Sequence, residues 1–387
     1  CWLQYELDRQ LVAVASACAE RGVSLKGDLP IGVAPYSVEV WSRPELFHLD
    51  QSAGAPPDAF AADGQNWGFP TYNWERMAED NYAWWRGRLQ HQERYFSALR
   101  IDHILGFFRI WEIPRAQTSG LAGHFHPALP YTLTEWQALL GDAIDVQTLA
   151  EPEEASSRQE APAEGYPLLR DPYSEGYHPR IAWEKTDPFH SWSADTRARW
   201  RAISDDYFYV RHNELYRHTG LRRLRALSSS TRLLLCAEDL GMIPASVPAV
   251  LDELQILSLE LERMPKTFTS TGWADPLTFP QRSVATTSTH DMPSLRGWWQ
   301  GLDEEEQSRY LREELHIEGP ITEEEVYRLI LQHHLASPAQ LVILPLADWM
   351  SCDKHLWLTS ADEEQINHPE DPNQYWCFRF PCTLSDI

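Results

Sequence analysis

The sequence has few positive charges and no long hydrophobic run. Lys and Arg number 33 against 57 Asp and Glu, which gives a formal net charge of −24. A chain this acidic repels a phosphate backbone, so we expect no nucleic acid partner, whereas a neutral ligand is indifferent to the charge. No segment approaches the ~18 consecutive apolar residues of a membrane-spanning helix, so we expect no membrane partner either.

Cysteines are few and scattered. None of the 6 cysteines forms a Cys-x-x-Cys pair, which argues against a disulfide framework or zinc site and favours a reducing compartment. The sequence also lacks an Asn-x-Ser/Thr glycosylation site, so we expect a cytoplasmic protein. The chain begins with Cys1 rather than Met, and we expect the natural N-terminus to lie upstream.

Tryptophan is abundant, with 17 copies in a chain that is 12% aromatic. We expect most of these side chains to fill a large core. The others can stack on the apolar faces of sugar rings. Stacking on single-stranded nucleic acid is the other common use of exposed aromatic faces, and the net charge argues against it.

Short apolar runs alternate with helical periodicity, a pattern typical of an α/β fold with a parallel sheet. Strands are expected near residues 25, 101, 235, 258, 286 and 343. A closed (β/α)8 TIM barrel needs eight strands, and an open arc would leave two edges unpaired. The pattern therefore indicates either an open doubly wound sheet or a barrel whose first two strands are missing from this chain.

Several of the expected strands end on an acidic residue. The acids are Asp28, Asp102, Glu238 and Asp291. A parallel barrel gathers such residues over the C-terminal mouth of its strands, whereas an open sheet collects its ligands at one switch point. Each acid could instead cap the helix that follows its strand. Acids on separate strand ends, repeated in order, favour the barrel.

The middle of the chain lacks clear periodicity and is interpreted as an insertion between two barrel strands. Within it, residues 151–162 are acidic and low in complexity, and we expect them to be flexible. The predicted organisation is a barrel part over 1–114, a partly flexible insertion over 115–200, and a second barrel part over 201–387 that includes the start of a C-terminal segment.

The acids at the strand ends fit sugar chemistry. Arg100 and Asp102 are two residues apart, so their side chains share a face of the strand, and the guanidinium favours an ionised carboxylate suited to a nucleophile or a charge stabiliser. Glu238 follows Leu-Leu-Leu-Cys-Ala, where desolvation can raise the pKa of the carboxyl and favour a general acid. One ionised and one protonatable carboxyl are the minimum set for cleaving a glycosidic bond. Asp291, after His290, is a third carboxyl that can hold sugar hydroxyls.

An ordered set of motifs resembles a known family. The motifs are Gly27-Asp28-Leu29-Pro30-Ile31, Gly54-Ala55-Pro56-Pro57-Asp58, Gly64-Gln65-Asn66-Trp67-Gly68-Phe69-Pro70, Arg100-Ile101-Asp102-His103, Ala237-Glu238-Asp239-Leu240-Gly241 and Thr289-His290-Asp291. In this order, and over nearly all of the chain, they resemble the 4-α-glucanotransferases (amylomaltases or disproportionating enzymes) of the α-amylase superfamily. Glu262-Arg263-Met264-Pro265 and the long insertion resemble the larger, plant-type cytosolic branch of that family.

The resemblance implies a role for each residue of the candidate site. Asp102 matches the nucleophile, Glu238 the acid/base and Asp291 the third carboxylate. Arg100 and His290 match residues that bind the sugar.

Three further residues match the family's substrate-binding positions. Trp67 matches a loop that covers the cleft, and Asp28 matches the acid at the mouth of the third barrel strand. Asn367 lies where the family has an Asn-x-Pro segment near the acceptor, although Glu370 stands where Gly usually follows.

The resemblance also implies the architecture and the reaction. The expected strands match the third to the eighth of a (β/α)8 TIM barrel, with the first two missing and a long insertion after the fourth. The implied reaction is a retaining double displacement that transfers α-1,4-linked glucosyl units from maltose or maltooligosaccharides to a soluble α-glucan. The resemblance implies no metal or organic cofactor.

Three alternatives stay open from the residues alone. His103, His290, Asp102 and Asp291 could hold a metal at the barrel mouth, although no His-Glu-x-x-His motif and no His-x-His pair on a first strand is seen. The same carboxylates could serve an α-glucan hydrolase. An aromatic cleft without turnover would be a glucan-binding protein.

Overall fold

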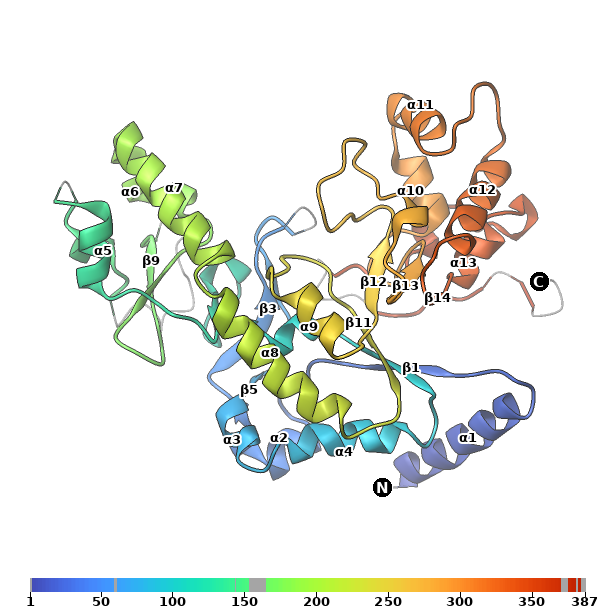
Figure 1. Ribbon diagram of the computed structural model, residues 1–387, viewed down its shortest axis with the longest axis horizontal. Helices are drawn as coiled ribbons and strands as arrows, with labels where there is room; N and C mark the ends of the chain where they lie inside the picture. The colour runs from blue at the N-terminus through green and yellow to red at the C-terminus, as the bar shows by residue number, and fades with distance from the viewer. Residues whose placement is uncertain are drawn as a thin grey trace. The chain divides into compact units, whose positions relative to one another are not determined.

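The computed structural model describes residues 2–58, 61–142, 144–152, 165–369, 375–380 and 382–383. The chain forms two compact units, Cys1–Leu254 and Gln255–Ile387 (Figure 1). No helix among the described residues combines the length and the hydrophobicity needed to cross a membrane. Most of residues 151–162, expected to be flexible, lie outside the described residues, as does Glu370.

The first unit contains a parallel sheet and an antiparallel sheet. The parallel sheet has the order β1-β6-β11, and the antiparallel sheet has the order β4-β3-β7-β8. The strands of this unit are β1 (Lys26–Leu29), β2 (Phe47–His48), β3 (Gln51–Ala55), β4 (Gln65–Asn66), β5 (Thr71–Tyr72), β6 (Ala98–Ile101), β7 (Ile110–Pro114), β8 (His124–His126), β9 (Leu168–Arg170), β10 (Tyr177–Pro179) and β11 (Leu234–Ala237). The helices are α1 (Trp2–Ala19), α2 (Val38–Ser42), α3 (Trp74–Ala78), α4 (Ala83–Gln92), α5 (Leu133–Leu140), α6 (Asp187–Ser191), α7 (Ala194–Tyr209), α8 (Asn213–Ser228) and α9 (Val247–Glu253).

The parallel sheet is built around β6. Leu99 and Ile101 on this strand are almost fully buried, and helices α4 and α8 pack together near it. On β1, Gly27 has no side chain because a Cβ there would collide with the ring of Phe96. The register aligns Asp28 of β1 and Cys236 of β11 with Arg100 of β6, so residues of one face of the sheet converge on Arg100.

The region expected to be an insertion packs around an aromatic core that it shares with Trp111 and Ile113 of β7. Elements α5, β9, α6 and α7 group together in Figure 1, apart from the β1-β6-β11 sheet. Trp136 of α5 stacks on Trp200 of α7 with ring centroids 5.1 Å apart, and both side chains are fully buried. Trp183 and Trp192 join the same core. The aromatic side chains therefore form a buried core in this region, although its sequence shows little helical or strand periodicity.

The second unit contains a parallel sheet of order β12-β13-β14 with helices packed around it. Its elements are β12 (Ser258–Leu261), β13 (Ser283–Thr286), β14 (Leu341–Val342), α10 (Leu295–Gly301), α11 (Glu304–Glu313), α12 (Glu323–Leu335) and α13 (Leu346–Met350). A core of Trp299, Tyr310, Tyr327 and Ile330 joins α10, α11 and α12.

The structure confirms a strand at each expected position and the α/β class. Between β5 and β6 the chain forms two helices rather than one, because Asn81 and Tyr82 take left-handed backbone angles between α3 and α4. The strand expected near residue 343 is short, since β14 ends at Val342 and α13 begins at Leu346. The strands form two parallel sheets in the described residues, and their closure into one barrel stays a prediction, as does the division at residues 114 and 200.

Candidate active site

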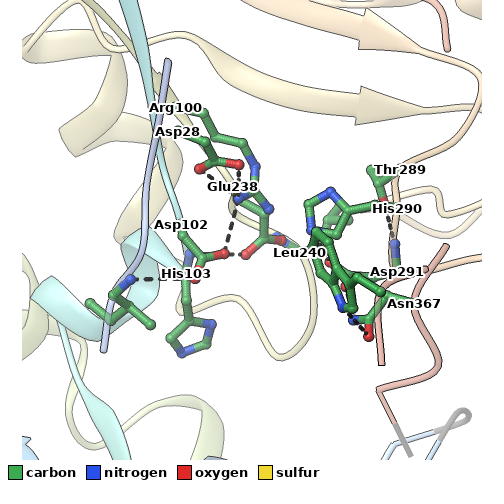
Figure 2. Close-up of polar contacts among 12 residues, drawn as sticks. Asp28, Arg100, Asp102, His103, Glu238, Leu240, Thr289, His290, Asp291 and Asn367 are labelled. Atoms are coloured by element: carbon green, nitrogen blue, oxygen red, sulfur yellow. Dashed lines mark hydrogen bonds and ion pairs between the residues drawn. The ribbon is translucent and has the colours of Figure 1, made fainter. Parts of the chain in front are cut away.

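Arg100 joins two carboxylates at the C-terminal end of the first parallel sheet. Its Nη1 donates to Oδ1 and Oδ2 of Asp28, both at 2.9 Å, and to Oδ1 of Asp102 at 3.0 Å (Figure 2). The Arg100 side chain is 13% exposed, whereas those of Asp28 and Asp102 are 48% and 34% exposed. A mostly buried guanidinium therefore holds two carboxylates that remain accessible to a ligand.

Glu238 lies beside Asp102 because the register of β6 and β11 continues past their ends. The backbone N–H of Glu238 donates to the carbonyl of Ile101 at 3.0 Å, and the N–H of Ile104 donates to the carbonyl of Glu238 at 3.0 Å. Ala237 pairs with Ile101, so one further step places Glu238 opposite Asp102. Neighbouring strands lie about 4.8 Å apart, and the two carboxyls of a retaining glycosidase are about 5–5.5 Å apart.

The Glu238 carboxyl is enclosed by the strand ends. Its Oε2 accepts from the backbone N–H of His103 at 3.2 Å and its Oε1 from that of Leu240 at 3.0 Å (Figure 2). Desolvation raises the pKa of Glu238 to about 7, against the opposing effects of Arg100 and the Leu240 N–H. This carboxyl can therefore give up and regain a proton near neutral pH, as a general acid and base must.

A pocket of about 420 Å³ opens next to Asp102. Its lining comes from two loops and from Asp102 after β6, and the loop residues are Pro30, Ile31, Gly32, Val33, Ala34, Pro35, Tyr36, Trp67, Gly68 and Phe69. The Trp67 Nε1–H donates to Oε1 of Gln65 at 2.9 Å, and its ring stacks on Phe69 and meets the edge of His103 at a centroid distance of 4.9 Å. The structure thus places Trp67 and Asp102 on the same pocket.

The second unit holds the remaining predicted residues in one cluster. Asn367 Nδ2 donates to Oδ1 of Asp291 at 2.6 Å, and Nε2 of His290 lies 3.2 Å from Oδ2 of Asp291 (Figure 2). The backbone N–H of Asn367 also donates to the carbonyl of His290 at 3.0 Å. Asn367, whose motif departs from the family pattern, is therefore bonded directly to Asp291 and to the backbone of His290.

Two contributors to this cluster were missed in the sequence. Trp376 donates its Nε1–H to Oδ1 of Asn367 at 2.9 Å and packs its ring 5.0 Å from that of His290. Buried Asp348 accepts from the hydroxyls of Thr287 and Ser288 and so fixes the segment after β13. Neither residue belongs to a recognisable motif, so only long-range contacts reveal them.

A third cluster, made of other residues, was also missed. His124, Asp171 and His178 are all buried in the first unit, with ligand atoms within 4.8 Å of one another. The spacing of His124 and His126 on β8 is the sequence signal that could have drawn attention to this region. The metal set suggested at the barrel mouth involves other residues.

Comparisons with known proteins agree with the motifs. The 4-alpha-glucanotransferase DPE2 of Oryza sativa subsp. japonica is 34% identical over 451 residues, which cover 100% of this chain and 47% of the relative. The 4-alpha-glucanotransferase of Chlamydia pneumoniae is 25% identical over 391 residues, covering 100% of this chain and 57% of the relative. The chain thus spans about half the length of the curated relatives it matches.

The fold resembles a solved structure, the amylomaltase from Streptococcus agalactiae in complex with acarbose. The TM-score is 0.63 at 20% sequence identity, and the match covers 99% of this chain and 58% of that one. At this identity the likeness shows the α/β fold alone. The family profile described as 4-alpha-glucanotransferase matches residues 1–384, and the chain belongs to this family.

Proposed function

We propose that the protein is a 4-α-glucanotransferase. In this proposal it transfers α-1,4-linked glucosyl units from maltose or maltooligosaccharides to a soluble α-glucan acceptor in the cytoplasm. The observation that carries the proposal is the pair formed by Arg100-bound Asp102 and Glu238, which has a pKa of about 7, on neighbouring parallel strands. Family membership supports the same reaction.

The two carboxyls divide the chemistry of a double displacement. Asp102 attacks the anomeric carbon while Glu238 donates its proton to the departing glycosidic oxygen, which leaves as a hydroxyl. The resulting β-glucosyl ester on Asp102 is attacked by the 4-hydroxyl of the acceptor. Glu238 then takes the proton of that hydroxyl, Asp102 leaves as a carboxylate, and the α-configuration is restored.

The other predicted residues bind and orient the glucan in this proposal. Asp291, held by His290 and Asn367, is the third carboxylate and grips hydroxyls of the reacting sugar. Asp28 fixes Arg100 by accepting from the same Nη1 that bonds Asp102. All of these groups would share one active site if the two parallel sheets are parts of one (β/α)8 barrel, with residues 115–200 as its insertion.

Transfer rather than hydrolysis requires that the acceptor hydroxyl reaches the ester before water does. The loop that carries Trp67 supports this requirement, since its ring and that of Phe69 form an apolar wall of the pocket beside Asp102. A maltosaccharide acceptor stacked there would displace water from the ester.

Substitution of Glu238 by Gln tests the proposal. We expect transfer from maltose to fall by about 10³-fold, because Gln keeps the shape of the side chain but cannot supply a proton. Glu262→Gln is the matched control: Glu262 follows β12, is buried and has a raised pKa, but it bonds to Tyr310.

Product analysis distinguishes the outcomes. Glucose together with longer glucans indicates transfer, whereas reducing ends that increase without elongation indicate a hydrolase and contradict the proposal. Maltose conversion that survives in Glu238→Gln would exclude this residue as the acid. An unsubstituted protein that binds maltooligosaccharides without converting them would be a binding protein.

A further inference from the structure

The first unit contains a second group of ligating side chains, remote in sequence from the proposed catalytic pair. His124 lies on β8, His178 on β10 and Asp171 in the turn between β9 and β10. All three are at least nine-tenths buried, and one ligand atom of each lies within 4.8 Å of the others. Among the residues that the structure describes, this is the one group of three His, Cys, Asp or Glu side chains placed so closely.

Each of the three side chains is held by a hydrogen bond on one polar atom. His124 Nδ1 lies 3.3 Å from the carbonyl oxygen of Phe125, and His178 Nδ1 lies 2.6 Å from the hydroxyl of Tyr207. Oδ2 of Asp171 accepts from the Ser174 hydroxyl at 2.5 Å. Histidines that ligate a metal are usually oriented in this way, through the ring nitrogen that does not face the ion.

One of the three opposite ligand atoms lacks a hydrogen-bond partner. His124 Nε2 is buried and has no hydrogen-bond partner, and His178 Nε2 lies 3.1 Å from Oδ1 of Asp171. If Tyr207 donates to His178, then His178 can donate to Asp171, but His124 still remains unpaired. A cation shared by His124 Nε2, His178 Nε2 and Asp171 Oδ1 satisfies every buried polar atom of the group.

We propose that His124, Asp171 and His178 bind one divalent transition-metal ion of the Zn²⁺ class. Two imidazoles and one carboxylate suit such an ion, whereas Ca²⁺ and Mg²⁺ prefer oxygen ligands. The imidazoles must be neutral to bind, and burial lowers the pKa of His124 well below its ordinary value. Zn–N bonds of about 2.0–2.1 Å require the three atoms to approach by about an ångström and the parallel rings, now 4.2 Å apart, to tilt.

The ion would tie the hairpin of β9 and β10 to the sheet that supports the substrate loop. β8 pairs with β7, β7 with β3, and β3 with β4, which immediately precedes Trp67. The hairpin of β9 and β10 supplies the other two ligands. The site is therefore structural, and its occupancy is independent of the proposed reaction.

Metal binding by the full chain tests the proposal. Untagged protein is stripped with a chelator, equilibrated with Zn²⁺ and desalted, and its metal content is measured by mass spectrometry. We expect one Zn²⁺ per chain and a loss of affinity of at least about 100-fold in His124→Gln. The matched control is His212→Gln, because His212 is also buried with an unpartnered Nε2 but lies outside the group. Zinc that is not retained, or that both variants bind equally, overturns the proposal.

A second measurement does not depend on the folding of a variant. Co²⁺ added to the stripped, unsubstituted protein should give visible d–d absorption bands, and Zn²⁺ should remove them and raise the thermal unfolding midpoint by several degrees. The absence of these bands overturns the proposal even if His124→Gln fails to fold.

Discussion

The alkaline limit of the transfer reaction should move in opposite directions in two variants that change the charge next to Glu238. Glu238 must be protonated when the glycosidic bond breaks, and its pKa of about 7 places the alkaline limb of kcat/KM near neutral pH. Arg100 is the strongest influence that lowers this pKa. Its removal should therefore move the limb to higher pH.

The size of the expected pKa shift depends on the fact that Arg100 interacts with several carboxyl groups at once. A single opposite charge at close range changes a carboxyl pKa by about 1–3 units, but Arg100 also binds Asp28 and Asp102 directly. We therefore expect the lower end, about one pH unit in Arg100→Met, which corresponds to about 1.4 kcal/mol. Asp28→Asn removes a negative partner from Arg100, so the limb should move to lower pH by about half a unit.

The assay is the pH dependence of kcat/KM for glucose release from maltotriose, with longer products measured in parallel. Arg100→Met will also reduce the rate, because Asp102 loses its ion pair, so only the position of the limb is compared. An α-maltosyl fluoride donor provides the control, since fluoride leaves without a proton and the limb assigned to Glu238 should disappear. If the alkaline limb lies at the same pH in both variants, or moves in the same direction in both, the electrostatic explanation of the Glu238 pKa is refuted.

Three further predictions follow. Asn367→Ala should lower kcat by about 10-fold to 100-fold because Asp291 loses a charged hydrogen bond, and steady-state kinetics with maltose measures this; an unchanged kcat would contradict it. Trp67→Ala should raise the ratio of hydrolysis to transfer several-fold, as chromatography of the products would show. Because the folded-state pKa of Glu262 is raised from 4.5 to about 8, the free energy of unfolding should fall as pH rises through this window. Glu262→Gln should reduce this pH-dependent loss of unfolding free energy by about 1–3 kcal/mol in denaturant titrations. An unaltered pH dependence would count against this prediction.

The elements that could be predicted are those with a strong local signal. Apolar runs between helical segments predict the positions of β1, β6, β11, β12 and β13, because a strand buried by helices needs such a run. The spacing of Thr322 and Glu325 predicts a helix start, and both bonds of that capping box are present. Tyr82 gives no such signal, although its side chain is buried against Trp74 and its backbone is left-handed between α3 and α4.

The candidate site likewise has a part that could be predicted from the sequence and a part that could not. Asp102 and Glu238 could be picked out as candidates because each is an acid directly after an apolar strand. The end of a parallel strand determines where the next side chain lies. The insertion could not be predicted in the same way, because its core is assembled from aromatic residues on many short elements. His124 and Asp171 are an example: they are 47 positions apart in the sequence, and the strands next to them, β8 and β9, belong to different sheets, so only tertiary packing brings the two side chains together.

The different chemistry of the two strand-end carboxyls follows from one register. Asp28 stands opposite Arg100 on one side, and uncharged Cys236 stands opposite it on the other. Arg100 therefore turns its Nη1 toward Asp28 and Asp102, which leaves Glu238 with backbone donors alone and with desolvation as the dominant effect on its pKa. A shift of either strand by one residue would place the acids on opposite faces and separate these roles. The parallel register of β1, β6 and β11 is thus the physical basis of the proposed division between nucleophile and acid.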